Sequence, residues 1–598
     1  MTHWWVRSIL IFLLLTMIIA GVSAETYYVR INGGDATRCD GLTNTDYSEG
    51  ANGHCAFSHP FWVLPPSGTP VFQSGDTLVI QRGTYRNGYG APNTDGCSSG
   101  YPWECRMPPI PSGSPQQPTR ILGEGWDTGC HDPPVLYGAE RSQSIIDLTG
   151  SNFTEVSCLE MTDNSQCIEF HPAIPCERDT YPFGNWGVQG IVGSDSMNVT
   201  LKDLNIHGFA DRGIHAGRLS NWSIINTTIA FNGYVGWDGD IDGTDSNSGL
   251  MYFKNVNISW NGCGEDQNHQ PIGCNGQTGG GYGDGLGTGF TGGDWVFEDT
   301  KFLHSTSDGL DLLYHSGTGT ITLRRVWSEG NAGNQVKVQG TTSIENSVII
   351  GNCGFFNNKS YTYYVDPNTP GVDPCRAAGD AVVIDFADGT KASIVNSEIY
   401  GEGNILILAV SEHRPCNGQE QLVSRNNILV GGPRFFNPEE NSTLFWDEGC
   451  TGLTLDNNYS VIFGVRPGSD NCPVGDHDIC GDPGIGKTGP DLFSMQPPGW
   501  SNALDHGLPA GTPVGIGRVP DHDIEGVGRP LGAGVDIGAY EFNVGSGSPV
   551  QRYDTDHSGF IEIGEAVTAL TDYLFNHTLS RADAVTVVTA YLFHTPVT

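Results

Sequence analysis

Three short segments in the middle of the chain carry the residue types best suited to chemistry. They are Asp284-Gly-Leu-Gly, Asp308-Gly-Leu-Asp311 and Asn334-Gln-Val-Lys337, which begin 24 residues apart (284 to 308) and 26 residues apart (308 to 334). Such steps are too long for a hairpin and too regular for a loop, so they predict successive turns of a coiled sheet. Residues one turn apart in such a sheet stack at about 4.8 Å, which brings matched side chains to one patch.

This patch has the composition of a cation site beside a proton acceptor. Asp284, Asp308 and Asp311 would place several carboxylate oxygens around one point, and oxygen clusters of this kind bind Ca²⁺. Lys337 lies one turn beyond Asp311, and the alternation of its valine neighbours points it to the outer face. A cation nearby would lower the pKa of the lysine and make it a general base. An ordinary Asp-Gly turn and a solvated lysine are the alternative interpretation.

Two further residues are candidate substrate contacts. Arg324 and Arg325 lie one strand before the lysine and alternate in direction, so only one of them can face a substrate as an anion clamp. His215 aligns with the column of the acidic segments and is the second candidate. The acidic loop 237–245 begins like a calcium loop but has Gly249 at the twelfth place, so a structural calcium, a groove wall and a solvated loop all stay open.

The elements that must position these residues form a repeat. Each copy has an apolar strand, a polar kink that often carries Asn or Asp, and a second apolar strand that ends near Gly. The copies span 198–208, 222–233, 250–262, 295–305, 321–331, 342–352, 392–403 and 422–432. Alternating apolar residues with a turn after each strand fit one rung of a right-handed parallel β-helix. The main rival, a β-propeller, needs four antiparallel strands per blade and periods of roughly 40 residues, so the shorter period favours the β-helix.

The acidic segments resemble the active-site region of family 9 polysaccharide lyases. The similarity is carried by Ser307-Asp-Gly-Leu-Asp311 together with Gly-Asn-Ala-Gly-Asn-Gln-Val-Lys at 330–337. It implies that Asp284, Asp308 and Asp311 bind Ca²⁺, that Lys337 is the base, and that the reaction is β-elimination on a 4-linked, pectate-like uronate polysaccharide. This chain has Ser307 where the family has an aspartate.

Two other classes of function stay open. One is a non-catalytic glycan-binding or cell-surface matrix and adhesion protein, docked through its C-terminal tail. The other is a glycoside hydrolase on the same fold, which needs paired carboxylates about 5–10 Å apart and no metal.

The C-terminal tail carries a second calcium motif. Its sequence fits the EF-hand loop, in which side-chain oxygens, one backbone carbonyl and a final bidentate glutamate form an oxygen cage. The matching positions are Asp554, Asp556, Ser558, Phe560, Glu562 and Glu565. The apolar-striped helix expected at 565–575 recurs at 583–593 without a second acidic loop. The tail resembles an EF-hand or dockerin module, which implies a cohesin-like or cell-surface protein as partner.

The N-terminus and the cysteines indicate export. Residues 1–24 have one arginine, an apolar run and small residues before the expected cleavage site, which is typical of a secretory signal peptide. No second apolar run of membrane-spanning length follows. Sixteen cysteines without a CxxC motif favour disulfides. The expected local pairs are 39/55, 97/105, 158/167, 263/274, 353/375 and 472/480.

Charge and composition complete the prediction. The formal charge of −38 argues against nucleic acid as a partner, and an acidic polysaccharide would need a divalent cation to bridge it to the protein carboxylates. The expected domains are an N-terminal cap and disulfide-rich start (25–185), the β-helix with a terminal seal at 521–542 (186–543), a linker (544–552) and the calcium module (553–598).

Overall fold

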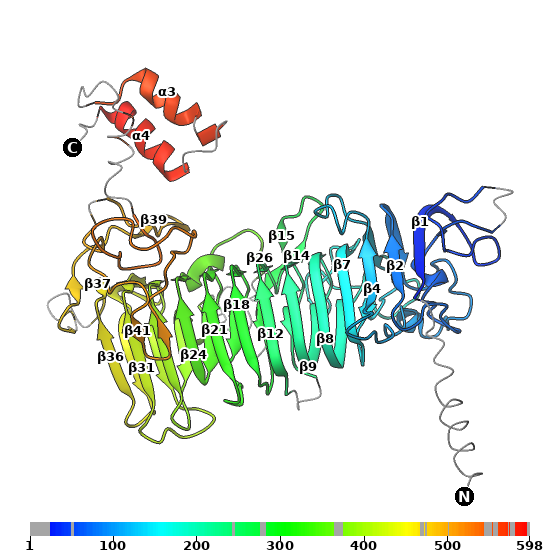
Figure 1. Ribbon diagram of the computed structural model, residues 1–598, viewed down its shortest axis with the longest axis horizontal. Coiled ribbons are helices and arrows are strands. Elements are labelled where there is room, and N and C mark those ends of the chain that lie inside the picture. Colours follow the sequence, from blue (N-terminus) through cyan, green and yellow to red (C-terminus); the bar gives the residue numbers. More distant parts are fainter. Residues whose placement is uncertain are drawn as a thin grey trace, which may run out of the picture.

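The protein is mostly β, with parallel strands coiled into a long solenoid. The computed structural model describes residues 24–48, 53–241, 246–275, 283–363, 375–466, 472, 475–499, 501–542, 550, 553, 560–571, 573–574 and 581–594. The chain advances from one end of the solenoid to the other, and the strands of successive turns lie side by side (Figure 1). This parallel pairing is that of a β-helix and excludes the antiparallel blades of a propeller.

Each complete turn places strands in three columns, and neighbours within a column pair in parallel. The first column contains β1 (Thr26–Gly34), β2 (Thr77–Ile80), β4 (Thr119–Gly123), β12 (Ser248–Lys254), β18 (Asp294–Glu298), β21 (Thr320–Arg324), β24 (Thr341–Glu345), β28 (Lys391–Val395), β31 (Gln421–Arg425) and β36 (Thr454–Asn458).

The second column contains β3 (Thr84–Asn87), β5 (Val135–Gly138), β10 (Thr228–Ala230), β13 (Asn257–Ser259), β19 (Lys301–Leu303), β22 (Trp327–Glu329), β25 (Val348–Gly351), β29 (Glu398–Gly401), β32 (Ile428–Gly431), β37 (Val461–Phe463) and β38 (Ile479–Cys480). These two columns correspond to the two strands of each predicted rung.

The third column contains β6 (Ile146–Asp147), β11 (Val235–Asp238), β17 (Leu286–Gly287), β20 (Leu310–Leu312), β23 (Val336–Gln339), β27 (Val382–Asp385), β30 (Ile405–Val410) and β35 (Thr443–Glu448). The long strands β7 (Asn152–Asp163), β8 (Gln189–His207) and β9 (Arg212–Ile225) bend from one column into the next. The sequence analysis predicted only two strands for each rung and did not include this third strand. The three segments with Asp284, Asp308 and Lys337 lie in this third column.

The polar kinks between the first and second columns adopt a left-handed backbone conformation. Their φ angles are 50° at Asn226, 52° at Asn255, 51° at Asp299, 54° at Arg325, 47° at Asn346, 48° at Asn396 and 55° at Asn426. Short Asn and Asp side chains tolerate this region better than other non-glycine residues, which explains the recurrence of these residue types. Arg325 therefore lies at a kink, and it does not alternate with Arg324 within a strand as predicted.

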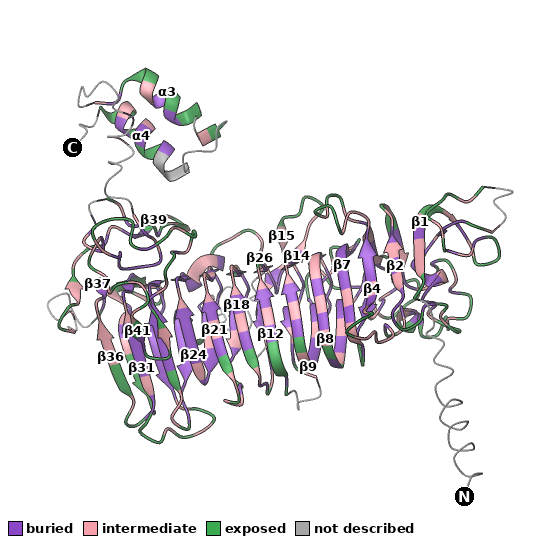
Figure 2. Cartoon of the chain, viewed as in Figure 1, coloured by how far each residue is buried: buried purple, intermediate pink, exposed green. Residues whose placement is uncertain are grey.

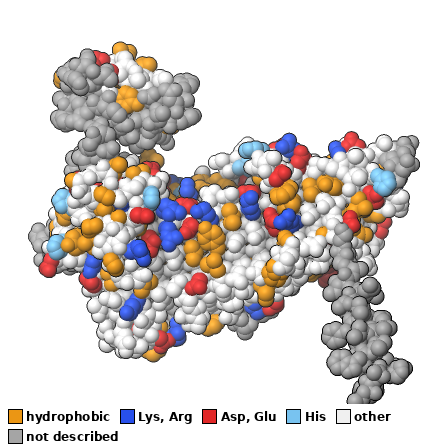
Figure 3. All heavy atoms as spheres, viewed as in Figure 1, with side chains coloured by type: hydrophobic (Ala, Val, Ile, Leu, Met, Phe, Trp, Pro, Cys, Tyr) orange, Lys and Arg blue, Asp and Glu red, His pale blue; other side chains and the backbone are white. Residues whose placement is uncertain are grey.

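Large apolar side chains fill the inside of the solenoid and stack from turn to turn. Trp237 is fully buried, with its ring 5.9 Å from that of Trp222 and 5.5 Å from that of Phe253. Figure 2 shows buried residues concentrated on the strands and exposed residues on the loops. On the face drawn in Figure 3, Lys and Arg side chains are interspersed with Asp and Glu.

The segment expected to seal the end packs along the outer flank of the last turns. Asn396 Nδ2 donates to the carbonyls of Asp536 and Gly538, at 3.1 and 3.2 Å. Arg529 and Glu541 form a fully buried ion pair of 2.7 Å. Kink asparagines of successive turns thus anchor this segment to the solenoid.

All sixteen cysteines form disulfides, which fits the expected export. The pairs are 39–55, 97–105, 130–158, 167–176, 263–274, 353–375, 416–450 and 472–480. Five of the predicted pairs are confirmed, whereas the pair 158/167 is wrong. Cys158 lies in β7, whose parallel partners bring it to Cys130 in a loop of the preceding turn.

The smaller elements lie in loops outside the repeat. They are β14 (Gly264–Glu265), β15 (Pro271–Ile272), β16 (Cys274–Asn275), β26 (Thr362–Tyr363), β33 (Pro433–Arg434), β34 (Asn437–Asn441), β39 (Gly486–Gly489), β40 (Leu492–Ser494), β41 (Pro513–Val514), β42 (Gly517–Arg518) and the 3₁₀ helices η1 (Pro60–Trp62), η2 (Pro102–Glu104), η3 (Cys353–Phe356) and η4 (Arg376–Gly379).

Two helices follow the solenoid, α3 (Ile563–Thr571) and α4 (Arg581–Phe593), at the positions expected from the apolar stripes. Their own apolar cluster includes Ile561, Ala569 and Val587. Among the described residues, no helix has the length and apolarity needed to cross a membrane. Most of the expected signal peptide lies outside the described residues.

Candidate active site

The register of the third column brings the acidic segments and the lysine together. Leu286 of β17 pairs with Leu310 of β20, and Asp311 of β20 pairs with Lys337 of β23. Val336 and Val338 are fully buried on either side of the lysine. Because side chains alternate along a strand, Lys337 faces the outside of the solenoid, above the stack that begins at β17.

Lys337 lies between two carboxylates. Its Nζ is 2.9 Å from Asp311 Oδ2 and 3.2 Å from Asp308 Oδ2. The Asp308 side chain is fully buried and that of Lys337 is 18% exposed, so the ion pairs lie largely out of water. Of Lys337 and Asp308, only the lysine is accessible to a ligand.

Backbone and amide donors hold the second oxygen of each carboxylate. Asp284 Oδ1 accepts from the Asp308 N–H at 2.9 Å. Asp308 Oδ1 accepts from the backbone N–H of Asn334 at 2.7 Å and from its side-chain amide at 3.1 Å. Asp311 Oδ1 accepts from the Leu313 N–H at 3.0 Å. Donors from the next turn of the solenoid therefore hold the carboxylates of Asp284 and Asp308 in place.

Arg376 is a site residue that the sequence analysis missed. It begins η4, directly after the Cys353–Cys375 disulfide. Its Nη1 lies 3.7 Å from Asp308 Oδ2 and 3.9 Å from Asp284 Oδ1, and it donates a hydrogen bond to the Ser307 hydroxyl. Ser307, which stands where the resemblance would place an aspartate, thus accepts a hydrogen bond from the Arg376 guanidinium. The cysteine preceding Arg376 was the only local sign that this arginine is held in place.

The charges shift the pKa values of the carboxylates in different directions. Burial, followed by repulsion from Asp308 and Asp311, raises the pKa of Asp284 to about 7. Burial also raises the pKa of Asp311, although Lys337 opposes the change. Burial acts in the same sense on Asp308, but Lys337 and Arg376 outweigh it, so its pKa is lowered. Of the three carboxylates, Asp284 is the one that neighbouring cations compensate least.

The lysine itself is held in its charged form. Burial favours the neutral amine, but the carboxylates of Asp308 and Asp311 outweigh this effect and raise the pKa of Lys337. The sequence analysis expected a bound cation to lower the pKa of Lys337. In this structure the two carboxylates stabilise the ammonium form instead.

A groove of about 450 Å³ lies over these residues. Its walls include the His215 side chain, whose Nε2 is 3.1 Å from the Asp240 carbonyl oxygen, so the structure does bring His215 to the site. The remaining lining residues are Arg212, Tyr234, Val235, Asp238, Asp240, Asp284, Gly287, Thr288, Gly289, Asp311, Tyr314, Lys337 and Arg376. Thus basic, aromatic and acidic groups surround one cavity.

Arg324 does not share this groove. It lies in β21, in the first column, and pairs with Glu298 and with Glu345 at 3.2 Å. Its cavity is a different one, lined by Arg325 and residues of the flanking segment. Arg324 is close to Lys337 in the sequence, but the chain passes from the first column to the third between them.

The tail motif is only partly described. Asp554, Asp556 and Ser558 lie outside the described residues, so its calcium cage stays a prediction. The Phe560 ring stacks on His594 at 4.5 Å. Glu565 lies in the first turn of α3, and its Oε2 accepts from the Glu562 N–H at 3.2 Å.

The donor types on the central face fit Ca²⁺. Among the residues that the structure describes, the three carboxylates form ion pairs with two cationic side chains, Lys337 and Arg376, and Asn334 Oδ1 is buried next to them without a hydrogen-bond partner. Carboxylate and amide oxygens are the ligands that this cation prefers. Lys337 and Arg376 occupy the space between the carboxylates. These two side chains must therefore move partly aside when an ion binds there.

The fold and the groove define a class, the disulfide-bonded parallel β-helix proteins with a charged groove on one column. No protein-family model and no curated protein matches the chain. Among solved structures, pectate lyase Pel9A is similar over 88% of this chain and 98% of its own, with 14% identity and a TM-score of 0.38. An alginate lyase from Paenibacillus sp. str. FPU-7 is similar over 65% and 92%, with 13% identity and a TM-score of 0.31. XylC in complex with xylose is similar over 86% and 98%, with 10% identity and a TM-score of 0.35.

Proposed function

We propose that this protein is a calcium-dependent polysaccharide lyase that cleaves 4-linked uronate polymers by β-elimination. The observation that carries the proposal is the position of Lys337, 2.9 Å from Asp311 and 3.2 Å from Asp308 on the floor of the groove. One basic side chain, buried carboxylates and a nearby guanidinium are the groups that this reaction needs.

Lys337 is the general base. Its neutral amine takes the proton on C5 of the uronate, and the electron pair of the C5–H bond forms the C4=C5 double bond. The glycosidic oxygen leaves C4 with the electron pair of the C4–O bond and takes up a proton from water. Because Asp308 and Asp311 raise the pKa of Lys337, the amine becomes available only when the pull of these carboxylates is relieved. Ca²⁺ held by Asp284, Asp308 and Asp311 would supply this relief and acidify the C5 proton by polarising the uronate carboxylate.

Arg376 and His215 recognise the substrate. The Arg376 guanidinium faces the groove beside the carboxylate cluster and can pair with an anionic uronate, as charged hydrogen bonds to carboxylates are the strong ones. His215 also lines the groove and is 26% exposed, so it can contact the sugar hydroxyls. Arg376 therefore takes the role of anion clamp that the sequence analysis gave to Arg324.

The first test is elimination by the purified full chain on a panel of pectic and other uronate polymers with calcium. The expected product absorbs ultraviolet light because of its new double bond. Lys337→Ala should lower kcat/KM by about 10²–10⁴, the usual contribution of a general base. Lys301→Ala, an exposed lysine on β19, is the matched control and should leave activity unchanged. A chelator should abolish the absorbance.

The alternatives give different results. Cleavage that continues in chelator without ultraviolet absorbance indicates a glycoside hydrolase. Glycan binding without turnover, equal in the parent and in Lys337→Ala, indicates a binding or adhesion protein. Either outcome, or no ultraviolet product from any polymer in the panel, contradicts the lyase.

A further inference from the structure

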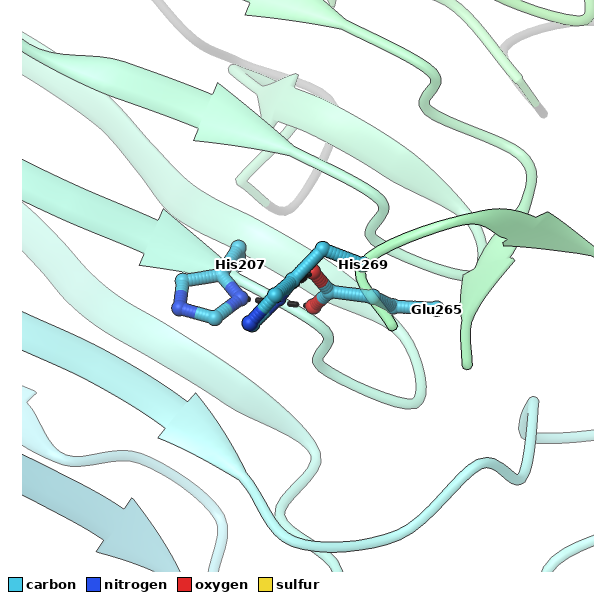
Figure 4. A group of neighbouring side chains, drawn as sticks. All are labelled: His207, Glu265 and His269. Carbon is cyan, nitrogen blue, oxygen red and sulfur yellow. Dashed lines mark hydrogen bonds and ion pairs between the residues drawn. The ribbon is translucent and has the colours of Figure 1, made fainter. Parts of the chain in front are cut away.

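A second cluster of ligand-type side chains lies on the second column, away from the groove. Figure 4 shows His207, Glu265 and His269 pointing toward one another. His207 is the last residue of β8, Glu265 lies in β14, and His269 lies in the turn between β14 and β15. The cluster therefore joins the solenoid wall to a loop that projects from it.

The three side chains meet through nitrogen and oxygen atoms. His207 Nδ1 is 2.6 Å from Glu265 Oε2, and His269 Nδ1 is 2.6 Å from the other oxygen, Glu265 Oε1. One ligand atom from each residue lies within 4.8 Å of the other two. Two imidazoles on one carboxylate form either a protonated ion bridge or the protein part of a metal site.

The loop is built to hold this arrangement. The Cys263–Cys274 disulfide closes the base of the β14–β15 hairpin. In the turn, Asp266 Oδ1 accepts from the N–H groups of Asn268 and Gln270, at 2.8 and 2.9 Å. The hairpin and its staple thus fix the ligand-bearing residues before any ion binds.

The backbone next to His207 leaves room for the carboxylate. Gly208 has a φ of 73°, and a Cβ atom there would lie 2.9 Å from Glu265 Oε2. Any side chain at this position would push the carboxylate away from the imidazole. The glycine therefore permits the close approach on which the cluster depends.

A further carboxylate stands behind the buried histidine. His207 is 6% exposed, and its Nε2 is buried without a hydrogen bond, 3.5 Å from Glu160 Oε1. In metal sites, a ligating histidine directs its other N–H to a carboxylate, which fixes the tautomer and the ring. Glu160 is placed for this role if the ion binds Nδ1.

The cluster also has an open side. A cavity of about 360 Å³ is lined by the three residues, together with Glu160 and Asp163. His269 is 74% exposed, so an ion and a small ligand can reach the cluster from solvent. Three protein ligands with a free fourth position are the arrangement of accessible zinc sites.

We propose that His207, Glu265 and His269 bind a zinc-class divalent transition-metal ion, with Glu160 orienting His207 and the fourth position open to the cavity. Two imidazole nitrogens and one carboxylate match the ligand preference of Zn²⁺, whereas Ca²⁺ takes oxygen ligands. Each imidazole nitrogen, now 2.6 Å from a Glu265 oxygen, must move away from it only slightly. Metal–ligand bonds of roughly 2.0–2.1 Å place tetrahedral ligands somewhat more than 3 Å from one another.

The test is zinc binding by the full chain, by calorimetry, with excess calcium present to fill the oxygen sites. We expect the parent to bind one zinc per chain. His269→Ala and Glu265→Gln should each lower the zinc affinity by roughly 10-fold or more. His54→Ala is the matched control, since His54 is also 74% exposed and pairs with a carboxylate, Asp40, at 2.7 Å. His54→Ala should bind zinc as the parent does.

Cobalt provides a second measurement, because its visible absorption reports the coordination number of the bound ion. Co²⁺ bound at the cluster should give the visible absorption of a four-coordinate ion in the parent and in His54→Ala, and lose it in His269→Ala. Failure of the parent to bind zinc, or equal zinc binding by His269→Ala and His54→Ala, would show that the cluster is an ion bridge and overturn the proposal.

Discussion

At the scale of single residues, the candidate active site is a problem of charge balance. Within the described part of the chain, the cations paired with Asp284, Asp308 and Asp311 are Lys337 and Arg376. The hydroxyl of Ser307 replaces the fourth carboxylate that the resemblance would place beside them, and it accepts a hydrogen bond from Arg376. A fourth carboxylate would deepen the repulsion that already acts on Asp284.

The raised pKa of Asp284 makes stability depend on pH. Its pKa is raised to about 7, above the roughly 3.9 of an unfolded aspartate. Between these values the folded state keeps a proton that the unfolded state releases, so stability falls as the pH rises from about 4 to 7. Asp284→Asn cannot ionise. Its melting temperature, relative to the parent, should rise across this interval and level off above it.

Thermal melts in chelator from pH 4 to 8 check this expectation, because a bound cation would itself compensate the carboxylate. Asp127→Asn, on an exposed loop, is the control and should show a constant difference from the parent. A constant difference for Asp284→Asn as well would mean that the buried carboxylate keeps an ordinary pKa.

At the scale of elements, a buried polar network shapes the turn that leads into β23. Asn331 Nδ2 donates to Gln335 Oε1 at 2.7 Å and to the Phe302 carbonyl at 3.0 Å. Gln335 Nε2 returns a hydrogen bond to the Asn331 carbonyl at 3.0 Å. Both side chains are fully buried, so the network fixes the start of the strand that carries Lys337.

Asn331→Leu should therefore destabilise the solenoid locally. The substitution keeps the volume but removes the side-chain partner of the Phe302 carbonyl and of the Ser305 N–H, which costs about 1–3 kcal/mol for each buried group left unsatisfied. We expect a lower melting temperature and, because Lys337 is less well positioned, a lower kcat. Asn185→Leu, at an exposed asparagine, should change stability by less than about 0.5 kcal/mol. Equal melting of the two variants would contradict a structural role for the network.

At the scale of the whole molecule, the solenoid and the tail have separate cores. The apolar cluster of α3 and α4 includes Ile561, Ala569 and Val587, and among the described residues it contains none from the solenoid. The flanking segment is different, because Val519 and Val535 pack on Val395 and Val423 of the last turns.

Truncation should separate these two cases. A chain that ends at residue 542 should keep the melting temperature and the activity of the solenoid and lose only the calcium bound by the tail. A chain that ends at residue 502 should melt earlier, because it exposes the valines of β28 and β31 to water. Calorimetric melts of both chains, with activity assays, test the prediction. A large stability loss in the chain that ends at residue 542 would show that the tail supports the solenoid.

The sequence by itself determined what repeats. A solenoid turn contacts its neighbours at a fixed spacing, so the apolar strands, the Asn and Asp kinks and the register of Asp311 with Lys337 follow from the period. Five disulfides were also predictable, for another reason: each joins cysteines that are close in the sequence.

Only the tertiary structure decided what lies outside the period. Arg376 reaches Ser307 from 69 positions along the chain, and His207 meets Glu265 across 58. Such contacts depend on the paths of inserted loops, which no repeat constrains. The same reason explains Arg324, whose turn carries it to another column, and Cys158, whose partner lies in the preceding turn.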